Sequence, residues 1–133
     1  MPKADAKTIL IVDDEDLIRD VTKSILETGG YEVLVASNGK EAISIFAEHS
    51  NHIDLVLTDM VMPEMDGISA LGVIKKMKSD VKAIAVTAHI DNARYIDLLG
   101  DVDAVLRKPF DMDMLLNTIQ RVLAETPRLK KAL

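Results

Sequence analysis

Polar side chains able to do chemistry follow four short apolar runs of this sequence. They are three carboxylates, a hydroxyl and an ammonium, carried by Asp13, Asp14, Asp59, Thr87 and Lys108. If the four runs are parallel strands of one sheet, these side chains meet at its carboxyl edge, where open α/β sheets bind ligands. Carboxylates suit a divalent cation such as Mg²⁺, and an ammonium beside a hydroxyl suits the oxygens of a phosphoryl group. The sequence therefore predicts a site for a cation and a phosphoryl group.

Each of these residues has a simpler interpretation when it is taken alone. Acidic residues such as Asp13 and Asp14 stabilise a helix start. Thr87 could be an ordinary strand-end hydroxyl and Lys108 a solvated surface charge. Asp59 fits no helix cap, because a turn of several residues follows it. If the three carboxylates lie about 5 Å apart, each pair repels by about 3 kcal/mol at an effective dielectric constant near 20, which a cation would offset. Asp59 could then attack phosphorus and form an acyl phosphate.

The segments around these residues alternate between strand and helix patterns. Five short apolar runs predict strands over 8–12, 32–36, 55–58, 83–86 and 104–107. Apolar residues at helical spacing predict helices around 17–26, 42–47, 68–77, 90–99 and 115–123. The first helix carries Leu17, Ile18, Val21, Ile25 and Leu26 on one face and ends at Gly29-Gly30; Ser37-Asn38-Gly39 leads into the second, and Asp111 is the expected N-cap of the last. This alternation predicts a doubly wound α/β fold, in which helices cover both faces of a parallel sheet.

The composition is that of a folded globular domain. Among 133 residues, 48% are apolar and 29% charged, and there is no cysteine for a disulfide or thiolate site. The net charge of −6 and only four aromatic residues argue against nucleic-acid binding. Without an apolar leader or a run of membrane-spanning length, the expected location is the cytoplasm, with no membrane contact. We expect a single domain over 1–126, with 127–133 as a tail or linker stub.

The sequence resembles the response-regulator receiver domain of two-component signalling from Thr8 to about Glu125. The residues that carry the resemblance are Ile11-Val12-Asp13-Asp14-Glu15, Asp59 with Met62-Pro63-Glu64-Met65-Asp66-Gly67, Val86-Thr87-Ala88 and Lys108-Pro109-Phe110. The resemblance implies a flavodoxin-like sheet of strand order 2-1-3-4-5 with five helices on its two faces. It also implies a cis peptide bond between Lys108 and Pro109.

The resemblance further implies roles for the polar residues. Asp59 would accept the phosphoryl group, and Thr87 and Lys108 would sense it. Mg²⁺ would be bound by Asp13, Asp14, Asp59 and the backbone carbonyl of Val61, either directly or through water. In the family, the positions of Val61 and His89 influence how readily water attacks the acyl phosphate.

One position departs from the family pattern. An aromatic residue often stands three positions before the lysine and turns inward on activation, and here that position is Val105. Valine has no ring to rotate and few χ1 choices. We therefore expect phosphorylation to change the face of the fourth expected helix, around 90–99, and the fifth expected strand, 104–107, subtly, through loop ordering rather than through a buried ring.

The favoured function is a phosphorylation-controlled switch. The expected donor is a histidine kinase or a histidine phosphotransfer protein, and the expected output is contact with an unknown downstream protein. The chain could be a stand-alone regulator, a relay intermediate or a receiver from a larger protein. The sequence does not decide whether phosphorylation produces a homodimer.

Two alternatives belong to other classes. One is an aspartyl-phosphate phosphohydrolase, which commonly needs a second aspartate at the position of Val61; we therefore expect no turnover of a free substrate. The other is a pseudo-receiver that only binds partners, which commonly lacks one of the five site residues.

Overall fold

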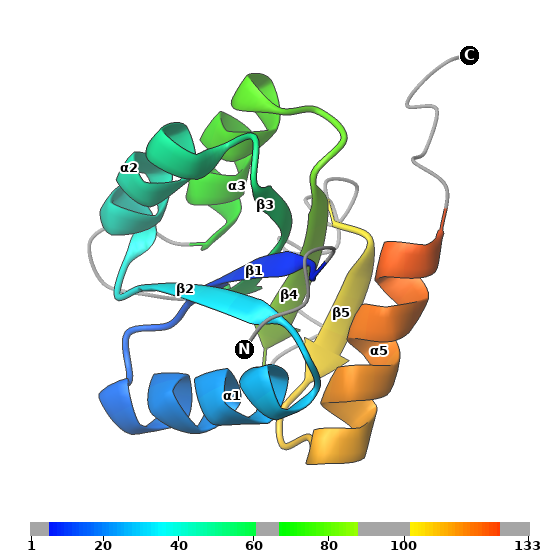
Figure 1. Ribbon diagram of the computed structural model, residues 1–133. Helices are drawn as coiled ribbons and strands as arrows, with labels where there is room; N and C mark the ends of the chain where they lie inside the picture. The colour runs from blue at the N-terminus through cyan, green and yellow to red at the C-terminus, as the bar shows by residue number, and fades with distance from the viewer. Residues whose placement is uncertain (1–5, 61–66, 88–101, 126–133) are drawn as a thin grey trace.

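A five-stranded parallel sheet forms the centre of the molecule (Figure 1). The structure is a computed structural model and describes residues 6–60, 67–87 and 102–125. The strands are β1 (Thr8–Val12), β2 (Glu32–Ala36), β3 (Ile53–Asp59), β4 (Lys82–Thr87) and β5 (Ala104–Arg107). They are arranged in the order β2-β1-β3-β4-β5, and every neighbouring pair is parallel. This confirms the strand order that the resemblance implies.

Helices cover both faces of the sheet. Among the described residues they are α1 (Asp16–Thr28), α2 (Gly39–His49), α3 (Gly67–Met77) and α5 (Met112–Ala124). In Figure 1, α2 and α3 lie together on one side of the sheet, and α1 and α5 lie on the other. The helix expected around 90–99 falls outside the described residues, as does the segment 127–133 that we expect to be a tail.

Alternation along the strands builds one apolar layer on each face. In β1, Ile9 and Ile11 belong to the layer under α1 and α5, whereas Leu10 and Val12 belong to the layer under α2 and α3. All five residues of β1 and all six of β4 are buried. Each fully buried aliphatic side chain contributes about 1.5–3 kcal/mol. A nearly continuous apolar run is therefore typical of a central strand in a parallel sheet that is covered on both faces.

The helix ends expected from the sequence are confirmed. Helix α1 ends at Thr28 with Gly29 as its C-cap, and Gly30 has φ of +96°, a conformation that favours glycine. The side chain of Asn38 accepts a hydrogen bond from the Glu41 N–H at the start of α2. Asp111 accepts one from the Met114 N–H, at 2.8 Å, and so caps α5.

The apolar face expected for the first helix is partly wrong. Leu17 is 74% exposed and Val21 is 50% exposed, whereas the buried residues of α1 are Thr22 and Leu26. Successive residues are turned by about 100° on a helix, so the row through Leu17 and Val21 lies beside the row that meets the sheet. The sequence pattern covered both rows, and packing selected one.

Within the described residues, no helix combines the length and the apolar composition that crossing a membrane requires.

Candidate functional site

Three carboxylates meet at the carboxyl edge of the sheet, as expected. Asp13 and Asp14 directly follow β1, and Asp59 is the last residue of the adjacent strand β3. One carboxylate oxygen of each residue lies within 4.8 Å of those of the other two. Asp13 is buried and Asp14 is exposed, while the side chain of Asp59 is 12% exposed. The sheet register therefore places the three acidic side chains where one cation can meet all of them.

The backbone around Asp13 determines where its carboxylate points. Its N–H donates to the Ala36 carbonyl on β2 at 3.1 Å. Its side-chain Oδ1 accepts the N–H of Glu15 at 2.9 Å. These two bonds fix the backbone of Asp13 against β2 and orient its side chain at the start of the turn into α1.

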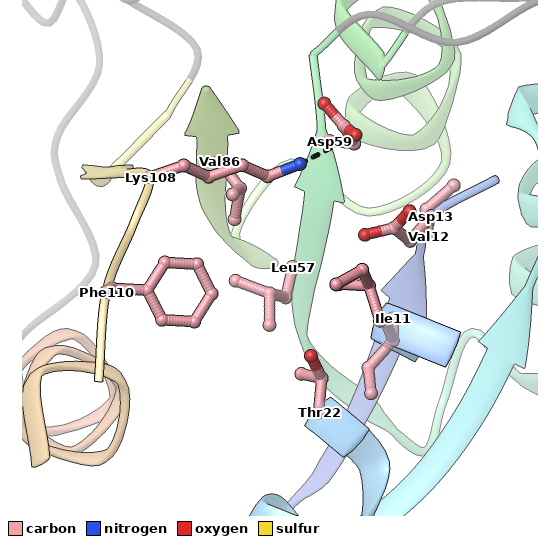
Figure 2. Close-up of a pocket in the computed structure, with 10 residues that line it drawn as sticks. Ile11, Val12, Asp13, Thr22, Leu57, Asp59, Val86, Lys108 and Phe110 are labelled. Carbon is pink, nitrogen blue, oxygen red and sulfur yellow. Dashed lines mark hydrogen bonds and ion pairs between the residues drawn. The ribbon is translucent and has the colours of Figure 1, made fainter. Parts of the chain in front are cut away.

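Lys108 brings a positive charge to the same place. Its Nζ lies 3.3 Å from Asp59 Oδ2, and the lysine side chain is 28% exposed. Figure 2 shows this long side chain crossing the end of β4 near Val86 to reach Asp59. The peptide bond between Lys108 and Pro109 is cis, as the resemblance implies.

Thr87 lies at the same edge, one position beyond Val86, the register partner of Asp59. It is 4% exposed, and its carbonyl accepts the N–H of Lys108 at 2.9 Å. The structure thus joins Thr87 to Lys108 through the backbone, while the role of its hydroxyl stays a prediction. Val61 and His89 fall outside the described residues.

The electrostatics of the cluster oppose three charged carboxylates. Burial raises the pKa of Asp13 above its ordinary value of 3.8, and the hydrogen bond from the Glu15 N–H opposes this effect. The negative charge of Asp59 raises the same pKa, that of Asp14 adds to it, and the positive charge of Lys108 lowers it. The surroundings of Asp13 therefore disfavour its charged form, whereas a bound cation would favour that form.

An apolar floor lies below the charged groups. A pocket there leaves about 20 Å³ for the centre of a water molecule, which is room for roughly one water. Figure 2 shows Phe110 and Leu57 facing each other below Lys108, with Thr22 at the base. The residues that line the pocket are Ile11, Val12, Asp13, Ile18, Thr22, Leu57, Asp59, Val86, Lys108 and Phe110.

Sequence reasoning missed Arg19. Its guanidinium donates to the carbonyl oxygen of Asp13 at 2.8 Å and to Asp16 Oδ1 at 2.5 Å. An arginine three positions after an aspartate is a visible helix pair, but its bond to a backbone carbonyl leaves no signal in the sequence.

Comparisons with known proteins agree with this geometry. The model of the response regulator receiver domain family matches residues 9–120. The chain belongs to this family. The receiver domain is 40% identical over 121 residues to the chemotaxis protein CheY of Bacillus subtilis, covering 89% of this chain and 98% of CheY. It is 37% identical over 117 residues to the sensor kinase CckA of Brucella abortus, covering 87% of this chain and 12% of CckA. The chain thus spans nearly all of one relative and a small part of another.

A solved structure shares the fold as well. The response regulator TrrA of Thermotoga maritima, in complex with Mg(2+)-BeF, is 37% identical, with a TM-score of 0.78 over 87% of this chain and 98% of that one. The flavodoxin-like receiver fold and its place in two-component signalling are therefore shown for this protein.

Proposed function

We propose that this receiver domain is a Mg²⁺-dependent phospho-acceptor in which Asp59 receives a phosphoryl group from a phosphohistidine of a partner kinase or phosphotransfer protein. The observation that supports this proposal most directly is the cluster of three carboxylates with Lys108 at one sheet edge. A cytoplasmic location and a downstream protein target that distinguishes the two states belong to the same proposal.

The donor set fits a hard divalent cation. The three carboxylates supply oxygen ligands within 4.8 Å of one another, with the Val61 carbonyl as a further proposed ligand. When bound, Mg²⁺ would neutralise charge on the carboxylates and on the phosphoryl oxygens. Asp13 and Asp14 would hold the cation, and burial of Asp13 keeps that carboxylate in place.

Asp59 would act as the nucleophile. Its carboxylate oxygen attacks phosphorus, an oxygen–phosphorus bond forms, and the phosphorus–nitrogen bond to the donor imidazole breaks. The imidazole nitrogen keeps the bonding electron pair and takes up a proton. Because the side chain of Asp59 is mostly buried and already lies beside Lys108, little reorganisation is needed before attack.

Lys108 and Thr87 would bind the transferred group. The ammonium that contacts Asp59 Oδ2 is within reach of a phosphoryl oxygen attached to that residue. The hydroxyl of Thr87 would donate to another oxygen. Since the backbone N–H of Lys108 bonds the Thr87 carbonyl, movement of either residue would be passed to the other.

The site suits an acceptor better than a hydrolase of free substrates. Valine stands at position 61, where a hydrolase would carry a second aspartate, and the small pocket below the carboxylates has room for roughly one water. We therefore propose that the domain assists its own phosphorylation and dephosphorylation without turning over a free phosphoester.

Intact-mass measurement after incubation with Mg²⁺ and acetyl phosphate tests this function. The parent is expected to gain one alkali-labile phosphoryl group, and Asp59→Asn is expected to gain none. Asp20→Asn is the matched control, because Asp20 is an exposed carboxylate on α1 outside the cluster. A folded parent that gains no group contradicts the proposal, and steady release of phosphate without a labelled protein favours the phosphohydrolase.

A further inference from the structure

Arg19 connects helix α1 to the loop that carries two of the carboxylates. Two of its nitrogens are engaged at once: Nη1 donates to the Asp13 carbonyl at 2.8 Å, and Nη2 donates to Asp16 Oδ1 at 2.5 Å. Its side chain is 15% exposed, although it starts from the first turns of a helix near the surface. Two fixed donors in a planar fork hold a guanidinium in one orientation.

The bond to Asp13 acts on both acidic residues of the loop. The Asp13 carbonyl belongs to the peptide group that links Asp13 to Asp14, so a bond to this oxygen restricts the plane of that peptide. On the other side of the same residue, the Asp13 N–H is bonded to the Ala36 carbonyl. Asp13 is therefore held by its backbone from both directions. Asp14 is exposed and gains little orientation from packing, so it depends on that peptide plane.

We propose that Arg19 is a positioning residue for the cation site, holding the Asp13–Asp14 peptide so that both carboxylates face the same point. The inference rests on the proposed Mg²⁺ site and names a residue that supports that site without contacting the cation.

The charge of Arg19 and its proposed positioning role predict opposite changes in Mg²⁺ affinity when Arg19 is removed. Arg19 carries a positive charge near three carboxylates, so its loss would by charge alone strengthen the binding of a cation. Loss of a residue that orients metal ligands weakens binding, typically about 10–100-fold. The direction of the change in Mg²⁺ affinity therefore separates the two roles.

The test compares Mg²⁺ binding by isothermal titration calorimetry in the parent, Arg19→Met, Arg19→Lys and Lys23→Met. Arg19→Met retains an apolar stem and is expected to bind Mg²⁺ about ten-fold more weakly than the parent. Arg19→Lys retains the charge but not the fork, and is expected to be weakened as well. Lys23→Met is the matched control: it removes one positive charge and one ion pair, to Glu27 at 2.9 Å, from the same helix. Its affinity is expected to stay at the parent level.

A second measurement needs no metal. In the metal-free protein, Arg19→Met is expected to shift the carbonyl-carbon resonance of Asp13 and the amide resonance of Asp14, and Lys23→Met is expected to leave both in place. If the parent binds no Mg²⁺, the proposed function fails. The shifts of these two resonances then test on their own whether Arg19 orients the Asp13–Asp14 peptide. A folded Arg19→Met variant with unchanged resonances, or with Mg²⁺ affinity equal to or above that of the parent, overturns the inference.

Discussion

Mutual repulsion between Asp13 and Asp59 should be measurable as a coupling energy in the metal-free protein. Their nearest ligand oxygens lie within 4.8 Å, and both side chains are mostly shielded from solvent. At an effective dielectric constant near 20, two unit charges at this distance repel by about 3 kcal/mol. Asparagine is close to aspartate in shape, so Asp13→Asn and Asp59→Asn remove the charge with little change in packing.

A double-mutant cycle separates the repulsion between Asp13 and Asp59 from the attraction between Lys108 and the carboxylates. Either single substitution relieves the repulsion, and the double substitution can relieve it only once. The two single gains in unfolding free energy should therefore exceed the gain of the double variant by about 3 kcal/mol. The 3.3 Å contact between Lys108 and Asp59 affects the single values but largely cancels in the cycle. Urea unfolding followed by circular dichroism, with a chelator present, gives the four free energies.

The pH dependence provides an internal check. Burial, with the charges of Asp59 and Asp14, raises the pKa of Asp13 in the folded state. As the pH falls, Asp13 therefore takes up a proton at a higher pH in the folded protein than in the unfolded chain. The contribution of Asp13 to stability is therefore highest below its ordinary pKa of 3.8 and is lost as the pH rises through the raised value. The coupling should fall as Asp13 becomes protonated. Additive single and double values at neutral pH, without metal, would refute the picture of three charged and repelling carboxylates.

Two further substitutions examine the charge and the packing around the site. Lys108→Met should raise the pKa of Asp13 further, since the lysine charge lowers it, so the metal-free protein should lose stability at neutral pH and Mg²⁺ should restore most of the loss; equal losses in both conditions would contradict this. Leu57→Ala removes a side chain that is 3% exposed and lines the pocket below the site, so the free energy of unfolding should fall by about 2–5 kcal/mol. The matched control Leu17→Ala, at a position that is 74% exposed, should stay within about 0.5 kcal/mol in the same urea titration.

Local chemistry explains why so much of the fold could be predicted. A strand covered on both faces, such as β1, is apolar at nearly every position, so its bounds are visible in the sequence. The side chains of Asn38 and Asp111 cap their helices for reasons that involve only the next three residues. The three carboxylates were predicted to meet because parallel strands end at one edge, and register then brings them within 4.8 Å.

Tertiary packing decides what the sequence left undetermined. The burial of Thr22 in place of Leu17 depends on how α1 is rotated about its own axis against the sheet, and no local pattern specifies this rotation. The bond from Arg19 to the Asp13 carbonyl depends on where the β1–α1 turn places that oxygen. Helical spacing and residue type carry no information on either point.

Residues of the candidate site lie toward different faces of the sheet. Asp59 lies two positions after Leu57 on β3 and therefore on the same side of the strand. Leu57 packs in the layer under α1 and α5. Thr87 lies two positions after Ala85 on β4 and therefore on the same side of that strand. Ala85 packs in the opposite layer together with Val105. Lys108 joins these two sides, because its ammonium contacts Asp59 while its N–H donates to the Thr87 carbonyl. Among the described residues, the bond from the Lys108 N–H to the Thr87 carbonyl is therefore one link between Asp59 and the opposite layer, and the bond from the Met60 N–H to the Val86 carbonyl is another that joins the ends of β3 and β4.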